Sequence, residues 1–121
     1  MAAAQLNLVI EQFNTFRQHL TWNSSVNSVS IPINLTGYIA SMQLRTNIED
    51  SLPIISLTNV ANSQGQIILG GIAGTIEIYI NNITTATMAS SGSYDLDLTA
   101  TNGDVIRLIQ GKYKVNLSVT R

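Results

Sequence analysis

The sequence contains no cysteine, which excludes a disulfide framework and any metal site built on thiolates. It contains a single histidine, His19, and a catalytic triad would need that histidine beside a nucleophile and an orienting acid. Serines are abundant, but none lies in a G-x-S-x-G nucleophile elbow. These absences indicate a protein that works without catalytic chemistry, and we expect that it is not an enzyme.

Charged residues are scarce, at 11% of the chain, with six Lys and Arg against seven Asp and Glu. A formal net charge of −1 provides neither the basic face of a nucleic-acid-binding protein nor a polybasic membrane patch. We therefore expect no nucleic-acid partner and no membrane partner. Proteins close to zero net charge tend to associate, which favours a surface that other proteins largely cover.

Long apolar runs are also missing. A membrane-spanning helix needs about 20 apolar residues, whereas the longest runs here, such as residues 66–69, have the length of a strand. Residues 1–12 have no positively charged n-region, so we expect no secretory signal. A length of 121 residues fits a single domain, residues 1–121, which is large enough to bury a hydrophobic core without staples.

What the sequence does have is an apolar period of two residues, the pattern of strands with one face in a core and one in solvent. Runs with this alternation cover residues 6–10, 16–22, 38–44, 76–80, 94–98 and 113–119. With turn signals at short intervals between them, they predict eight or nine strands in an all-β sandwich or small barrel. Helices do not alternate with the strands, which disfavours a parallel α/β sheet.

Three segments between the strands indicate turns or loops. Asn102-Gly103 predicts a tight hairpin turn with a positive φ angle at both residues. Residues 23–34 are polar and residues 50–53 end in proline. We expect longer loops at both of these places, where a proline costs no ladder hydrogen bond.

One segment departs from the strand pattern. Residues 82–89 lie between two predicted strands but lack their alternation. The side-chain oxygen of Asn82 suits the cap of a helix N-terminus. We expect one short helical turn near residues 82–89, with Ile83 and Met88 facing inward.

The acidic and glycine-rich motifs have structural explanations. Asp95 and Asp97 lie on one face of a predicted strand, about 7 Å apart, where Arg107 of the next strand can pair with them. A hard cation needs several such oxygens, usually gathered by loops. Residues 70–74 are rich in glycine but lack the Lys-Ser/Thr of a phosphate loop and precede a strand. We expect no catalytic, cofactor-binding or metal site.

His19 alternates with the apolar residues of its strand and is expected to face solvent. Tyr79 lies on the face opposite the isoleucines of residues 76–80, and the favoured interpretation is a side chain that packs across strands. The alternative is an exposed aromatic side chain, which is a candidate contact for a partner protein or a glycan.

Residues 34–45, NLTGYIASMQLR, resemble the D/N-L-T-G-Y-x-A-x-M-Q-[IL]-R signature of small structural proteins of tailed bacteriophages. Other pieces agree in order over nearly the whole chain: residues 10–12, 15–16, 20–22, 66–76, 93–98, 102–103, 105–108, 111–115 and 119–121. The chain departs from this family at Phe13-Asn14, where Gly usually follows Glu-Gln, and in residues 23–33, which carry less charge than usual.

The resemblance implies a compact, immunoglobulin-like antiparallel β-sandwich built into the phage particle, commonly in several copies. No catalytic residue is carried over from it. We therefore predict a virion structural protein, assembled in the host bacterial cytoplasm, that acts as an adaptor or linker in the tail, baseplate or fibre-attachment region. A capsid decoration protein and, less favoured, a host-glycan-binding module are the alternatives.

Association with other virion proteins would use strand edges and loops. The first and last strands, residues 5–11 and 112–120, are the expected edges or docking segments, and residues 1–4 are expected to form a flexible or partner-ordered tail. The candidate partner contacts are Tyr79, Trp22, Val26, Val29, Ile31, Val119 and Arg121.

Overall fold

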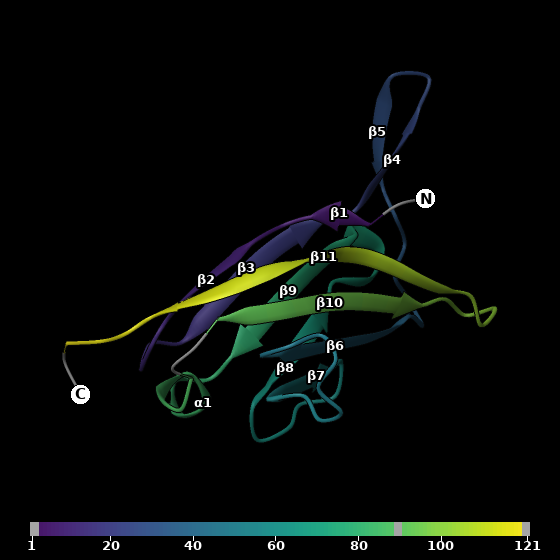
Figure 1. Cartoon of the computed structure of the whole chain (residues 1–121). Helices are drawn as coiled ribbons and strands as arrows, with labels where there is room; N and C mark the ends of the chain where they lie inside the picture. The colour runs from purple at the N-terminus through teal and green to yellow at the C-terminus, as the bar shows by residue number, and fades with distance from the viewer. Residues whose placement is uncertain (1–2, 89–90, 120–121) are drawn as a thin grey trace.

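The computed structural model describes residues 3–88 and 91–119, and it is an all-β sandwich (Figure 1). A large sheet of six strands has the order β1-β11-β10-β6-β7, with β2 also paired to β11. Its strands are β1 (Ala4–Gln5), β2 (Leu8–Glu11), β6 (Ile39–Arg45), β7 (Ile55–Thr58), β10 (Gly92–Thr99) and β11 (Val105–Asn116).

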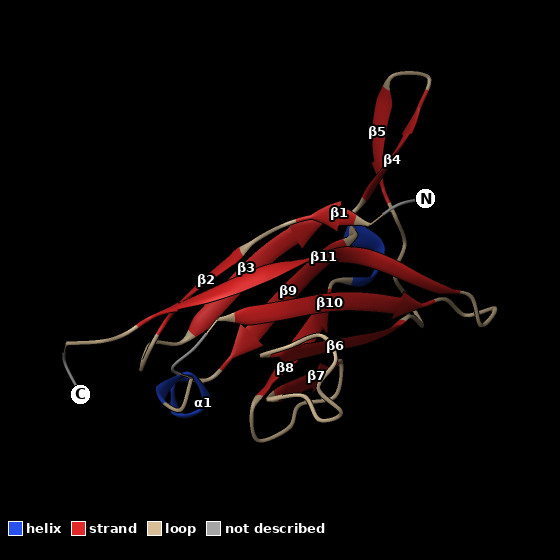
Figure 2. Cartoon of the chain, viewed as in Figure 1, coloured by secondary structure: helices blue, strands red, loops and turns tan. Residues whose placement is uncertain are grey.

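A small sheet of three strands faces the large one. It has the order β3-β9-β8, with β3 (Phe16–Thr21), β8 (Gly65–Leu69) and β9 (Thr75–Ile80). A separate hairpin of β4 (Asn23–Val26) and β5 (Val29–Pro32) stands off the sandwich (Figure 1). Figure 2 shows the two helices of the described residues, η1 (Gly71–Ala73) and α1 (Asn82–Ala86), at the ends of β9.

The strand order follows the immunoglobulin-like pattern. In that fold one sheet holds strands B, E and D, and the other holds G, F and C, extended by C′ in variable-type domains. Here β3, β9 and β8 take the first set of places, and β11, β10, β6 and β7 take the second. β1 and β2 pair with β11 in parallel, whereas the other pairs are antiparallel. The predicted all-β, immunoglobulin-like sandwich is confirmed.

The described residues form eleven strands rather than eight or nine. The core lies between the two sheets because alternate side chains of each sheet point inward. Both sheets contribute fully buried side chains, among them Ile76, Ile78 and Ile80 of β9 and Leu96 and Leu98 of β10. The alternation in the sequence therefore identified the inner faces correctly, and the additional strands are short or lie outside the sandwich.

The prediction of a loop over residues 23–34 was wrong, because most of this segment is the β4–β5 hairpin. Asn27 and Ser28 have φ angles of 50° and 65°. A positive φ at both central residues gives a two-residue turn whose twist matches the flanking strands. The turn has no glycine to mark it, and the described side chains of the hairpin form no buried face that would give the sequence a strong apolar pattern.

The turn at Asn102-Gly103 is wider than predicted. Gly103 has a φ of 95°, whereas Asn102 is not among the residues with positive φ. The N–H of Gly103 donates to the carbonyl of Ala100 at 2.9 Å, and the N–H of Ala100 donates to the carbonyl of Asp104 at 2.8 Å. These bonds define a three-residue loop with a glycine bulge. The hairpin was therefore predicted correctly, but its turn type was not.

The loop predicted at residues 50–53 is present.

The predicted helical turn is present but begins one residue earlier than expected. Asn81, not Asn82, is the cap, and its side-chain oxygen accepts from the N–H of Thr84 at 2.8 Å. Met88 is buried as predicted, but Ile83 is 76% exposed and does not face inward. The last residue of the predicted segment, Ala89, lies outside the described residues.

The strands at the two ends of the chain differ from the prediction. β11 pairs with β10 on one side and with β1 and β2 on the other, so the last strand is not an edge. It ends at Asn116, and Val119 beyond it is 98% exposed rather than inward-facing. The predicted tail of residues 1–4 is also wrong at Ala4, which pairs with Ile109 in the chain's own sheet. Met1 and Ala2 lie outside the described residues. β2 is an edge strand, as predicted.

Candidate protein-binding interface

The β4–β5 hairpin, here called the arm (residues 23–32), projects from the sandwich into solvent (Figure 1). It contains no Asp, Glu, Lys or Arg, and its described side chains are all exposed. Val29 and Ile31 leave 58% and 49% of their surface in solvent. A two-stranded hairpin is marginally stable on its own in water. Val29 and Ile31 are two residues apart and therefore share one face of β5, which makes the arm a candidate contact surface.

The base of the arm is fixed to the sandwich. The N–H of Trp22 donates to the carbonyl of Gly74 at 2.8 Å, and the N–H of Ile33 donates to the carbonyl of Trp22 at 2.9 Å. The half-buried Trp22 side chain packs against the core. Gly74 has a φ of 68°, and a Cβ there would lie 2.8 Å from the Trp22 oxygen, so glycine permits this close approach. The arm therefore rises from a rigid support.

The edge of the large sheet at β7 is closed by side chains of the loop that follows it. The N–H of Ser56 donates to Oε1 of Gln64 at 3.0 Å, and Nδ2 of Asn62 donates to the Ser56 carbonyl at 2.9 Å. Nε2 of Gln64 also donates to the carbonyl of Ile54 at 3.2 Å. Because unpaired main-chain groups at an edge invite a further strand, these contacts protect β7 from strand addition.

The edge of the small sheet at β8 borders a groove of about 310 Å³, here called the β8 groove. Residues 35–38 and 66–69 line it, together with Asn59 and Gly71. None of these residues is charged, and Ile68 is 41% exposed. An uncharged groove along an edge strand suits an extended segment that is itself uncharged.

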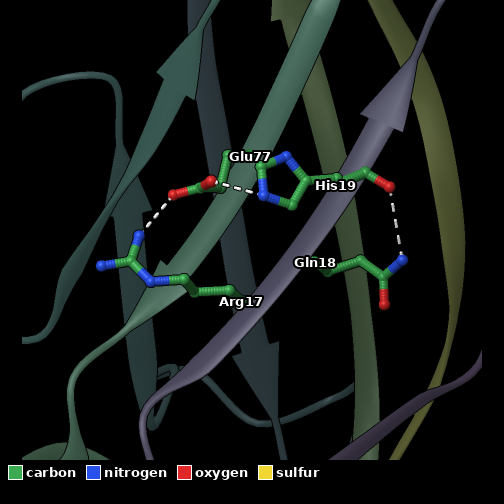
Figure 3. A network of polar contacts seen from close by, with 4 residues as sticks. All are labelled: Arg17, Gln18, His19 and Glu77. Atoms are coloured by element: carbon green, nitrogen blue, oxygen red, sulfur yellow. Dashed lines mark hydrogen bonds and ion pairs between the residues drawn. The ribbon is translucent and has the colours of Figure 1, made fainter.

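The outer face of the small sheet carries a charged cluster. Figure 3 shows Glu77 between Arg17 and His19, whose Nη1 and Nε2 atoms lie 2.5 Å and 2.7 Å from its carboxylate oxygens. The guanidinium carbon of Arg17 lies 4.5 Å from the centre of the Tyr79 ring, within range of a cation–π interaction. His19 is exposed, as predicted. The cluster satisfies its own charges and covers the tyrosine ring, so it is a packed surface rather than an acid–base site.

The outer face of the large sheet carries the predicted carboxylate pair. Arg107 of β11 contacts both side chains, with Nη2 3.4 Å from Asp95 and Nε 3.2 Å from Asp97. The hydrogen bond to Asp97, followed by the charges of Asp95 and Asp97, raises the pKa of Arg107 above its ordinary value. These residues line a hollow of about 380 Å³ with Gln43 and Arg45. The expected cross-strand pairing is confirmed, and the one guanidinium contacts both carboxylates.

The predicted contact residues near the arm lie together. Val29 and Ile31 are on β5, and Trp22 is at the base of the arm. Val26 belongs to β4, although its side chain is outside the described part of the structure. The sequence analysis placed Val26, Val29 and Ile31 in a loop and Trp22 at the end of a strand, whereas the structure places the first three on one hairpin with Trp22 at its base.

The other predicted contacts lie apart from the arm. Tyr79 is half-buried on the outer face of β9, and Val119 follows the end of β11. Arg121 lies outside the described residues. Sequence reasoning missed the β8 groove, because residues 35–38 and 66–69 are distant in the sequence and no side-chain pattern brings them together.

The described residues, 3–88 and 91–119, contain no group of three or more His, Cys, Asp or Glu that could hold a metal ion. No helix in these ranges has the length and apolar character needed to cross a membrane. Comparison with family models and with curated proteins finds no match to this chain.

Proposed function

We propose that this protein is a virion structural protein of a tailed bacteriophage, acting as an adaptor or linker in the tail, baseplate or fibre-attachment region. The arm supports association most directly, because an uncharged hairpin exposing Val29 and Ile31 rises from a fixed base. The phage setting is supported by the resemblance of residues 34–45 to small structural proteins of tailed phages. The partners are other virion proteins, and the protein is present in several copies.

In this proposal the sandwich is a rigid body that presents the arm. The outer faces of both sheets carry ion pairs that are satisfied within the chain, centred on Glu77 and Arg107. The arm contains no charged residue and therefore forms no ion pair with the sandwich. Burial of its apolar side chains against a neighbour would therefore supply the driving force for association.

Host-glycan binding has less support from the same surfaces. A sugar-binding site commonly uses an open aromatic face, and the candidate here is Tyr79. The guanidinium of Arg17 lies over that ring, and moving it would also disturb the contact between Arg17 and Glu77. A capsid decoration protein would use the same arm and would differ in its place in the particle.

Purified virions provide the test of the proposed function. Mass spectrometry should find the chain in several copies per particle, and a cryo-electron map should place it in the tail, baseplate or fibre attachment. Its absence from purified particles would overturn the proposal, and a position spread over the capsid shell would favour the decoration alternative.

The role of the arm can be tested in the same particles. The double substitution Val29→Lys with Ile31→Lys should reduce incorporation at least about tenfold, because charge would be buried at the contact. Ile83→Lys is the matched control, since Ile83 is exposed on α1 away from the arm. Equal incorporation of both variants would contradict the role given to the arm.

A further inference from the structure

The free edge of β3 continues into the arm. The N–H of Trp22 donates to the carbonyl of Gly74 at 2.8 Å, and the carbonyl of Trp22 accepts from the N–H of Ile33 at 2.9 Å. Trp22 thus turns both main-chain groups toward the side on which β9 and β5 lie. Because these groups alternate along a strand, the even-numbered residues of β3 and β4 face β9 and β5, and the odd-numbered residues face away. The outward-facing residues are Arg17, His19, Thr21, Asn23 and Ser25.

This edge, here called the β3–β4 edge (residues 17–25), is open. All of its outward-facing residues are exposed. Among the described residues their main-chain groups make one hydrogen bond, in which Nε2 of Gln18 donates to the carbonyl of His19 at 3.4 Å (Figure 3). That distance exceeds the usual range of about 2.7–3.2 Å. By contrast, β7 is capped by side chains and β8 is fully buried at Ile67.

The fold also leaves the position beside β3 without a strand. In constant-type immunoglobulin domains strand A lies beside strand B, and β3 takes the place of strand B here. The N-terminal strands β1 and β2 pair with β11 of the large sheet instead. No strand of the described chain therefore lies on the free side of β3. A strand from another molecule would complete the small sheet.

We propose that two copies pair antiparallel along the β3–β4 edge, so that the arm of each copy lies beside β3 of the other. A two-fold axis at Thr21 places every outward-facing residue opposite an outward-facing residue of the second copy. Besides Thr21 with itself, the pairs are His19 with Asn23 and Arg17 with Ser25. Each pair exchanges two main-chain hydrogen bonds, and any other symmetric register leaves an outward-facing residue unpaired. This inference rests on the proposed function and names a second copy as one partner of the arm.

The side chains that this register brings together are compatible. On the inner face of the small sheet, the half-buried Leu20 of each copy lies opposite Trp22 of the other, and apolar pairs directly opposite one another stabilise a sheet. On the outer face, Arg17 and His19 lie opposite uncharged side chains, and both stay beside Glu77 of their own chain. No like charges meet across the contact.

The pairing supplies the sheet that the arm lacks in one copy. A two-stranded hairpin is marginally stable on its own, whereas three or more strands are stable. In the dimer, β5 and β4 of one copy continue into β3, β9 and β8 of the other. β5 then forms the end of the sheet, where Pro32 faces outward and has no N–H to donate. Because proline blunts an edge, the association closes at two copies.

Opposite charges at the two-fold axis test the contact in the full chain. Light scattering after size exclusion should give a dimer for the unmodified protein. Thr21→Lys and Thr21→Glu each place like charges directly opposite one another, so each alone should dimerise at least about threefold more weakly. An equal mixture of the two variants should dimerise more tightly than either, because a lysine then faces a glutamate. Ser41→Lys is the matched control, since Ser41 is exposed on β6 of the large sheet, and it should dimerise as the unmodified protein does.

Two proline substitutions test the main-chain bonds separately. Ser25→Pro removes an outward N–H from β4, whereas Ser30→Pro removes one from the far edge of β5, and the bonds within the hairpin remain. Ser25→Pro should weaken dimerisation at least about tenfold, since the symmetric contact loses a bond at each end, and Ser30→Pro should leave it unchanged.

Three results would overturn the proposal: an unmodified chain that is monomeric at all concentrations, a mixture of the two Thr21 variants that dimerises no better than either alone, or equal dimerisation of the two proline variants. Incorporation into virions is measured independently, so a failure here leaves the proposed function to its own test.

Discussion

The hydroxyl of Tyr94 donates a hydrogen bond of 2.5 Å to the main-chain carbonyl of Leu6, a residue 88 positions away in the sequence. Tyr94 belongs to β10, whereas Leu6 lies in the short link between the parallel strands β1 and β2. The tyrosine side chain is only 5% exposed. This contact therefore ties the edge of the large sheet to its centre from within the core.

Replacing Tyr94 with Phe should lower the free energy of unfolding by about 1–2 kcal/mol, because the Leu6 carbonyl loses its donor. Thermal or denaturant unfolding measures the change. Tyr38→Phe is the control, since Tyr38 is half-buried and its hydroxyl makes no hydrogen bond to the described residues. If both variants lose the same stability, the bond to Leu6 contributes nothing specific.

The same burial predicts a loss of stability at high pH. Desolvation raises the pKa of Tyr94 from 10.0 to about 12. The unfolded chain therefore releases this proton at lower pH than the folded protein does, and deprotonation favours unfolding. The contribution is complete below pH 10.0 and is lost as the pH rises toward about 12.

Tyrosinate absorbance, compared between the unmodified protein and Tyr94→Phe, isolates this group from the other tyrosines. The difference should titrate near pH 12, and the decline in unfolding free energy above pH 10.0 should be shallower in the variant. A difference that titrates at the ordinary tyrosine pKa would contradict burial of the hydroxyl.

The fold was largely predictable because most of its strands have one face toward solvent and one face in the core. Ile76, Ile78 and Ile80 are fully buried on β9, and the alternation with polar neighbours recorded that burial in the sequence. The pairing of Arg107 with Asp95 and Asp97 followed from the same period across a recognisable hairpin. Such local patterns are physical consequences of the pleat.

The candidate site was less predictable, for two physical reasons. Both faces of the arm meet solvent, so Val29 and Ile31 create no pattern that a core would enforce, and Asn27-Ser28 lacks the glycine that commonly marks such a turn. The β8 groove depends on residues 35–38 lying beside residues 66–69, and these segments are far apart in the sequence. Side-chain periodicity records which face of a strand is buried but not which distant segments meet.

The support beneath the arm can be tested at Gly74. Gly74→Ala should destabilise the fold by at least about 1–2 kcal/mol, because a φ of 68° disfavours a side chain and the new Cβ would approach the Trp22 oxygen to 2.8 Å. Unfolding by denaturant measures the loss, and hydrogen exchange at Ile33 should reveal loosening at the arm base.

Gly103→Ala provides the control for backbone conformation alone. Gly103 has a φ of 95°, but a Cβ there would meet no atom within 4 Å. The loss of unfolding free energy in Gly103→Ala should therefore come from backbone conformation alone, without a steric clash. The amide hydrogens at the base of the arm should exchange at the same rate as in the unmodified protein. A Gly74→Ala variant that is no less stable than Gly103→Ala would contradict the tight approach to Trp22.

Capping of the β7 edge can be tested by removing Gln64, whose side chain binds the N–H of Ser56 and the carbonyl of Ile54. Gln64→Ala should cost about 1–2 kcal/mol of unfolding free energy, since both groups lose a partner. Because an open edge recruits further strands, the variant should also aggregate faster with concentration, measured by static light scattering. Gln110→Ala is the matched control, since Gln110 lies on the interior strand β11 and its side chain binds no described group. Aggregation of Gln64→Ala no faster than that of Gln110→Ala would mean that the sheet edge is protected by something other than these side-chain caps.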